Sequence, residues 1–157
     1  MTKPGRSRAD AWRWALAVCG LLVAADQGAK AAVVANIAPR HATDLPLGFQ
    51  IAHVENHGVA FGFLGGGGPL VVAVTIAALA FVLVWFARDP GRPWLWLAVG
   101  LIAGGALGNL ADRARTGAVI DFFDPPAWPA FNLADVGITV GALVLVGIVL
   151  APERDAS

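Results

Sequence analysis

Four aspartates and two asparagines fall within one stretch, residues 104–138, between two strongly apolar runs: Asp112, Asp121, Asp124, Asp135, Asn109 and Asn132. An ionisable residue in or beside a membrane span is costly, so it marks a functional site by default. Two carboxylates that share one proton can activate a water molecule and protonate a leaving amine. The stretch therefore predicts acid–base chemistry at a membrane boundary.

Two of these carboxylates have contrasting neighbours. Asp121 is flanked on both sides by pairs of apolar residues, which disfavour the charged form, so we expect its pKa to be raised. Asn132 and Asp135 have the spacing of a helix N-cap and its N3 residue, and a helix N-terminus favours the charged form of Asp135. Environments that favour different protonation states identify an acid/base pair. A helix cap and an ordinary loop aspartate would be the structural alternative.

Two further polar groups have both a structural and a functional interpretation. Asp26 and Lys30 are four residues apart in the first apolar run, so they share a helix face and can neutralise each other. Asn109, Asp112 and Arg113 share a face where the third run ends, after glycines that permit close helix packing. Each group could be an ion pair or amide that ties the helices together. Alternatively, each could position substrate or brace the site.

Other catalytic chemistries have little support. Ser7 and Ser157 are terminal, Cys19 has no histidine near it in sequence, and Lys30 has no serine partner. One cysteine permits neither an internal disulfide nor a structural zinc site, and the three histidines share no ligand spacing. We therefore expect no metal and no cofactor.

The composition is that of an integral membrane protein. Hydrophobic residues make up 57% of the 157-residue chain and charged residues 14%, with a mean hydropathy of +0.68. A net charge of zero and the lack of a basic patch argue against a nucleic-acid partner. Residues 16–19 faintly resemble a lipoprotein cleavage box, but the apolar run continues past Cys19. We expect a retained first span.

The apolar runs predict one all-α membrane domain, residues 1–157, with four transmembrane helices at about 11–35, 69–87, 94–111 and 133–151. Each is close to the roughly 20 residues that cross a bilayer. The outer loops are about 36–68 and 112–132. Alternation over 47–54 predicts a small β-like platform on the membrane surface. Pro125, Pro126 and Pro129 exclude a continuous helix in the second loop.

Basic residues and tryptophans predict the orientation. The side with both termini carries Lys3, Arg6, Arg8, Arg13, Arg88, Arg92 and Arg154, whereas the other side carries Arg40, Arg113 and Arg115. The tryptophans that gather at the more basic end are Trp12, Trp14, Trp85, Trp94 and Trp96. Positive charge and an aromatic belt on one side place both termini in the cytoplasm.

Taken together, the polar blocks resemble the signal peptidase II family, the bacterial lipoprotein signal peptidases. The blocks occur in order over nearly the whole chain: Asp26-Gln27 with Lys30, Asn56–Gly62, Gly104–Arg113, Val119–Phe122 and Phe131–Asp135. Within the second block, His57 and Val59 replace the small or polar residues that are usual in the family.

The resemblance implies a membrane aspartic endopeptidase. It would remove the signal peptide from diacylglyceryl-modified prolipoproteins by cutting before the lipidated cysteine. The implied dyad is Asp121 and Asp135. The residues implied to bind substrate or orient the dyad are Asn56, Asn109, Arg113 and Asn132, and the supporting residues are Asp26, Lys30 and Asp112.

The resemblance also implies a setting. The first outer loop would form a platform and a lid over the lipidated peptide. The protein would be a monomer in the bacterial inner membrane, with its site near the outer face. Its partners would be lipidated prolipoproteins and membrane lipids.

Two other functions fit parts of the sequence. An ion- or proton-coupled carrier would use intramembrane carboxylates as relays, but it predicts acidic residues at the midplane of several spans. A lipid transferase would use a metal-binding aspartate cluster on cytoplasmic-side helices. The clustering of aspartates at one outer interface favours the peptidase.

Overall fold

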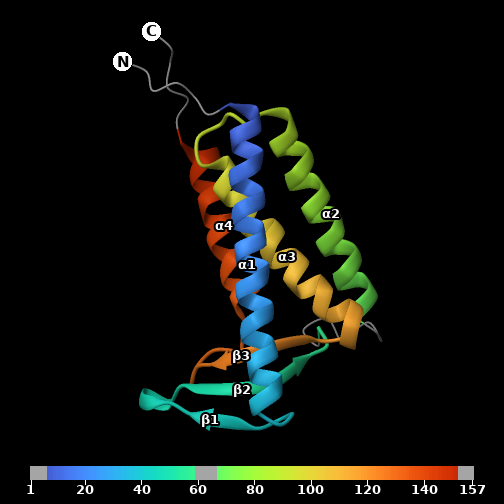
Figure 1. Ribbon diagram of the computed structural model, residues 1–157, viewed down its shortest axis with the longest axis vertical. Coiled ribbons are helices and arrows are strands. Elements are labelled where there is room, and N and C mark those ends of the chain that lie inside the picture. Colours follow the sequence, from blue (N-terminus) through green and yellow to red (C-terminus); the bar gives the residue numbers. More distant parts are fainter. Residues whose placement is uncertain (1–6, 59–66, 152–157) are drawn as a thin grey trace.

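The computed structural model describes residues 7–58 and 67–151 and combines four long helices with a three-stranded sheet (Figure 1). Each helix is long and apolar enough to cross a membrane. The elements are α1 (Arg8–Asn36), β1 (Ala42–Asp44), the short 3-10 helix η1 (Pro46–Gly48), β2 (Gln50–Asn56), α2 (Gly67–Arg88), α3 (Leu95–Thr116), β3 (Val119–Asp124) and α4 (Leu133–Leu150). The four predicted spans are therefore confirmed.

The third helix runs further than hydropathy predicted. We expected the span to end near residue 111 and the loop to begin at Asp112, but α3 continues to Thr116 and Asp112 lies inside it. Gly117 ends the helix with a left-handed φ of 79° and donates its backbone N–H to the carbonyl oxygen of Arg113. A left-handed C-terminal residue is ordinarily glycine, because other side chains are strained there. The polar end of α3 is thus helical.

The sheet joins the loop between α1 and α2 to the loop between α3 and α4. β1, β2 and β3 form one antiparallel sheet in that order, with a register shift in β2 between Ile51 and Val54. The extended segment expected at 47–54 is confirmed for β2, whereas residues 46–48 form η1. The second loop contributes β3, a strand that we did not predict. Its pairing with β2 places Asp121 opposite Val54.

Close helix packing centres on α3, which contacts α1, α2 and α4. A Cβ atom at Gly100 would lie 2.7 Å from the carbonyl oxygen of Ala15, and one at Gly104 would lie 2.9 Å from that of Cys19. On the other side, Gly105 meets the backbone of Ala134. Small residues let membrane helices approach to this distance. The glycine surfaces therefore hold the polar end of α3 against both α1 and α4.

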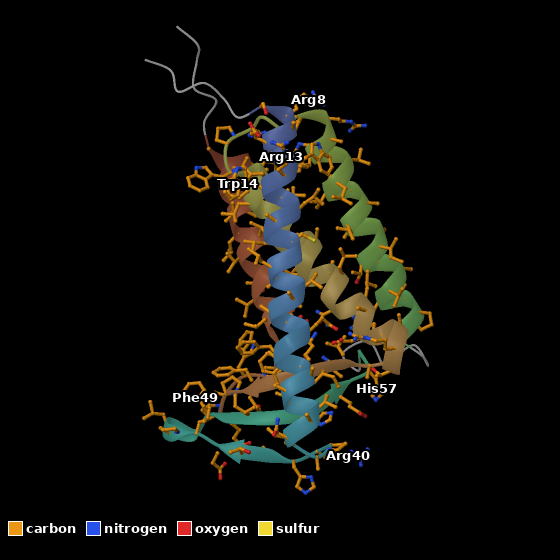
Figure 2. The ribbon with its side chains drawn as sticks, viewed as in Figure 1. Arg8, Arg13, Trp14, Arg40, Phe49 and His57 are labelled. Atoms are coloured by element: carbon orange, nitrogen blue, oxygen red, sulfur yellow. The ribbon has the colours of Figure 1, made fainter. Side chains whose placement is uncertain are left out.

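The other end of the bundle is closed by arginines and aromatic residues. Arg8 Nη2 donates to the carbonyl oxygen of Ala87 at 2.9 Å, at the end of α2, and Arg92 Nη2 donates to that of Ile148 at 2.9 Å, near the end of α4. Figure 2 shows Arg8 and Trp14 at this end, far from the sheet. The start of α1 and the end of α4 thus lie together, opposite the platform (Figure 1).

Candidate active site

Asp121 is held in the middle of β3 with only 2% of its surface exposed. Its two carboxylate oxygens accept hydrogen bonds from different elements. Asn132 Nδ2 donates to Oδ1 at 2.7 Å, and Asn56 Nδ2, from the end of β2, donates to Oδ2 at 2.9 Å. The register of β2 against β3 is therefore what brings Asn56 to the aspartate.

The expected rise in the pKa of Asp121 is found, to about 6. Burial is the main cause, because it removes water from the charged carboxylate. The hydrogen bond from Asn56 opposes the shift, the negative charge of Asp135 adds to it, and the hydrogen bond from Asn132 and the charge of Lys30 oppose it more weakly. Asp121 is therefore protonated more easily than an ordinary aspartate.

Asp135 lies in the first turn of α4 and is half-buried. The predicted cap is present in both directions. Asn132 Oδ1 accepts from the backbone N–H of Asp135 at 2.9 Å, and Asp135 Oδ2 accepts from the backbone N–H of Asn132 at 3.3 Å. Asp135 Oδ1 accepts from Asn109 Nδ2 at 2.8 Å. These contacts fix the carboxylate of Asp135 at the start of α4.

Two buried asparagines join the aspartates. Asn132 Nδ2 lies 3.2 Å from Asn109 Oδ1 as well as 2.7 Å from Asp121. Because Oδ1 of Asn109 faces the donor Nδ2 of Asn132, Nδ2 of Asn109 points at Asp135. Asn132 Nδ2 donates to the carboxylate of Asp121 and Asn109 Nδ2 donates to that of Asp135, so the two asparagines link the two carboxylates.

Beneath the pair lies a buried ion cluster. Lys30 Nζ is 2.7 Å from Asp26 Oδ2, 2.7 Å from Asp112 Oδ2 and 3.1 Å from Asn109 Oδ1. These three contacts use all three ammonium protons. Both aspartates and the lysine are at most 5% exposed. Removing one partner from such a cluster is costly, because it leaves a buried charge without compensation.

The cluster also contacts the backbone just before each catalytic candidate. Asp26 Oδ1 accepts from the N–H of Ala134 at 3.0 Å, and Asp112 Oδ2 accepts from the N–H of Ile120 at 3.4 Å. Ala134 precedes Asp135, and Ile120 precedes Asp121. Residues of α1 and α3 thus set the position of both carboxylates, although neither helix carries one of them.

The structure brings together eight of the nine candidates: Asp26, Lys30, Asn56, Asn109, Asp112, Asp121, Asn132 and Asp135. The exception is Arg113, whose side chain forms no hydrogen bond or ion pair within residues 7–58 and 67–151. The Asp112–Arg113 pair that we considered is wrong. The arginine on Asp112 is Arg115, with Nη2 at 3.2 Å from Oδ1.

Two further polar residues belong to the cluster, Gln27 and Arg115, to which the sequence assigned no role in the site. Gln27 Nε2 lies 2.9 Å from Asp112 Oδ1 and 3.2 Å from the carbonyl oxygen of Gly108. A polar amide inside an apolar span was the signal for Gln27. Asp124, which had no assigned role, ends β3 opposite Gln50. Val59 lies outside the described residues, and so does the rest of 59–66 in the loop that is expected to form the platform and lid.

Comparisons with known proteins agree on one family. The family model "Signal peptidase (SPase) II" matches residues 18–151. A lipoprotein signal peptidase of Pelotomaculum thermopropionicum is 42% identical over 142 residues, which are 89% of this chain and 93% of that protein. One from Moorella thermoacetica is 39% identical over 138 residues, 86% of this chain and 91% of that protein. A solved bacterial membrane enzyme superposes with a TM-score of 0.80 at 28% identity, over 90% of this chain and 94% of that one.

Proposed function

The chain belongs to the signal peptidase II family and acts as an aspartic endopeptidase that processes prolipoproteins; we propose that Asp121 and Asp135 are its catalytic pair. It is a multi-pass protein of the inner membrane. Family membership does not support the carrier function, which we therefore abandon. The single observation that supports the assignment is the pair of amide bridges, Asn132 to Asp121 and Asn109 to Asp135, which join two carboxylates from different elements.

In the proposed reaction, the two aspartates have different tasks. Asp121, whose pKa is raised to about 6, is the acid, and Asp135 in the first turn of α4 is the base. Asp135 takes a proton from water as the water oxygen attacks the scissile carbonyl carbon. Asp121 gives its proton to the carbonyl oxygen, so a neutral diol forms.

Collapse of the diol completes the balance. Asp135 returns its proton to the leaving amine nitrogen while the carbon–nitrogen bond breaks, and one diol hydroxyl returns a proton to Asp121. The products are the carboxyl end of the signal peptide and the free amine of the mature protein. Both aspartates end in the protonation states in which they began, so the reaction needs no further proton donor or acceptor.

We place the scissile bond just before the diacylglyceryl-modified cysteine. Asn56 and Arg113 are the proposed contacts to the peptide, because Asn56 lies at the sheet end of the site and the guanidinium of Arg113 has no partner within the described residues. The excess of basic residues at the other end of the bundle supports cytoplasmic termini and a site at the outer face. We propose that the protein is a monomer bounded by membrane lipids.

The test uses purified protein and two forms of one prolipoprotein, with and without the diacylglyceryl group. We expect cleavage of the lipidated form only, with no change when a chelator removes divalent metal. Asp121→Asn and Asp135→Asn should each abolish turnover while the protein still inserts and folds. Asp124→Asn, on the same strand as Asp121, is the matched control and should retain activity. Full cleavage by Asp121→Asn would refute the assignment, and chelator-sensitive activity would revive the metal-dependent alternative.

A further inference from the structure

One end of the sheet exposes three large apolar side chains. Leu47 is 88% exposed, Trp128 70% and Leu45 39%. We call these three residues the platform tip. Every other exposed large hydrophobic side chain in the described ranges lies in a transmembrane helix or, for Trp94, at its cap. The platform tip is therefore an apolar surface that the helix bundle does not require.

The platform tip has a defined backbone conformation that is held by packing. Leu47 has a left-handed φ of 66°, and the next residue, Gly48, has a φ of 78°. A left-handed leucine is strained, so its surroundings must hold it in place. A Cβ atom at Gly48 would lie 3.7 Å from Cβ of Pro126, which shows that the η1 turn packs against the loop of Trp128.

Three aromatic rings connect the chain segments that carry the platform tip. The ring of Phe123 lies 5.6 Å from that of Phe49 and 5.2 Å from that of Phe131, between ring centroids. Phe49 follows η1, Phe123 belongs to β3, and Phe131 precedes α4. The two exposed turns are therefore joined to each other and to the start of a membrane helix through one set of rings.

The position of the platform tip favours contact with lipid. Figure 1 shows the η1 end of the sheet extending sideways beyond the bundle, and Figure 2 places Phe49 at that end and His57 at the other. The loop of Trp128 leads within five residues to Leu133, the first residue of α4, which is 36% exposed. Exposure continues down α4 at Val136 and Val140. The loop of the platform tip thus leads directly into a helix with exposed apolar side chains.

The charges near the platform tip exclude an electrostatic attraction to anionic headgroups. In residues 44–50 and 123–133 the charged side chains are Asp44 and Asp124, and there is no lysine or arginine. What remains is apolar and aromatic surface, the kind that settles at the boundary between headgroups and acyl chains. We propose that the platform tip inserts into the outer interface of the bilayer and anchors the sheet there.

This anchor has a consequence for the proposed reaction. Asp121 lies two residues before Phe123 on the same strand, so a sheet fixed at one depth also fixes the depth of Asp121. A lipidated substrate has its scissile bond held at a set depth by its own acyl chains. The consequence for catalysis depends on the proposed function, whereas insertion of the platform tip does not.

Insertion is tested with a dye that reports its surroundings. In a Cys19→Ala background, Leu47→Cys carries the dye NBD, and Thr43→Cys on β1, the edge strand opposite β3, is the matched control. Each protein is placed, one copy per disc, in nanodiscs of phosphatidylcholine with or without lipids that bear a nitroxide near the headgroup. Asp121→Asn can be included in both, so that the result is independent of catalysis.

We expect blue-shifted emission and strong nitroxide quenching at position 47, with water-like emission and little quenching at position 43. The same result is expected when a third of the lipid is phosphatidylglycerol. Water-like emission at position 47 would overturn the proposal. So would a blue shift that requires two copies per disc, which would assign the platform tip to self-association.

The effect on turnover is measured with the double variant Leu47→Ser/Trp128→Ser. In nanodiscs the KM for the lipidated substrate should rise about tenfold with kcat within twofold of the original value. In detergent, where no bilayer fixes the depth, both constants should match those of the unaltered protein. An equal loss of activity in detergent would indicate a structural defect and contradict anchoring, whereas failure of the proposed dyad would leave the dye experiment unchanged.

Discussion

Asn132 donates a 2.7 Å hydrogen bond from Nδ2 to Oδ1 of Asp121, while its own Oδ1 caps the helix that carries Asp135. One side chain thus does two separable jobs. Its oxygen satisfies a backbone N–H at the start of α4, as any good N-cap would. Its nitrogen orients a carboxylate on β3, which most N-cap residues could not do. The division can be tested because serine can replace the first function only.

Asn132→Ser should keep the helix cap and lose the amide that orients Asp121. We expect kcat to fall about 100-fold, as when one preorganised donor is removed from an active site. Asn132→Ala should lose the same activity and, because it also lacks the cap, about 1 kcal/mol more stability than the serine variant. Cleavage kinetics and thermal unfolding in detergent measure the two effects. Full activity in Asn132→Ser would show that the Asn132–Asp121 hydrogen bond is dispensable.

The pH profile should report the protonation of Asp121. Burial raises the pKa of Asp121 to about 6, and the proposed acid must carry its proton. The value of kcat/KM should therefore decline as the pH rises through about 6, with the apparent pKa belonging to the coupled pair. Rates with the lipidated substrate between pH 4.5 and 8.5 test this. A profile without an alkaline decline would contradict the assignment of Asp121 as the acid.

Asn56→Ala should move that decline to higher pH. The hydrogen bond from Asn56 stabilises the charged form of Asp121 and so lowers its pKa, and losing it raises the pKa further. A hydrogen bond to a charged group is worth about 1.5–3 kcal/mol, so the shift should be about one pH unit or more. KM is followed separately, because Asn56 is also a proposed substrate contact. Asp124→Asn should leave the profile where it is.

The catalytic candidates could be found from sequence because their signals are local. The Asn132-to-Asp135 spacing is a helix cap, and the apolar residues around Asp121 lie next to it in the chain. The strand β3 had no such signal, since its partner β2 lies more than sixty residues earlier in sequence and strand formation depends on that partner. A local pattern could not supply the pairing.

Hydropathy predicted the end of α3 too early in the chain, for a different reason. Hydropathy marks where an apolar run stops, not where a helix stops, and Ala111–Arg115 contains good helix formers that continue α3 beyond the apolar run. The same helix explains why Arg115, and not Arg113, pairs with Asp112. Residues one apart point about 100° away from each other on a helix, whereas residues three apart are neighbours, so Arg115 reaches Asp112 and Arg113 does not.

Lys30→Met should be strongly destabilising. It leaves Asp26 and Asp112 buried with their main cation removed, and breaking such a cluster costs about 3–5 kcal/mol. The triple variant Asp26→Asn/Lys30→Met/Asp112→Asn, which removes all three charges, should recover much of that loss. It should still be nearly inactive, because the carboxylate contacts to the backbone before both proposed catalytic aspartates are weakened.

Arg115→Gln is the matched control for the cluster. The side chain of Arg115 is 61% exposed, so water screens its charge, and Lys30 still pairs with the buried Asp112 when Arg115 is replaced; we expect a cost of about 1 kcal/mol or less. Thermal unfolding should rank the variants with Arg115→Gln near the original protein, the triple variant below it and Lys30→Met lowest. If Lys30→Met unfolded like Arg115→Gln, the buried cluster would not have the stabilising role assigned to it.

Gly105→Ala should impair catalysis from a distance. A Cβ atom at Gly105 would collide with the carbonyl oxygen of Ala134, and the backbone cannot yield without moving Asp135, the next residue. We expect the free energy of unfolding to fall by about 1–3 kcal/mol, as for overpacking in other proteins. The fold decrease in kcat should be larger than the fold change in KM. Gly147→Ala is the control, because nothing lies within 4 Å of a Cβ atom there and alanine favours a helix. Gly147→Ala should be at least as stable as the original protein and equally active. If Gly105→Ala matched Gly147→Ala in stability and activity, the close contact between α3 and α4 would not position Asp135.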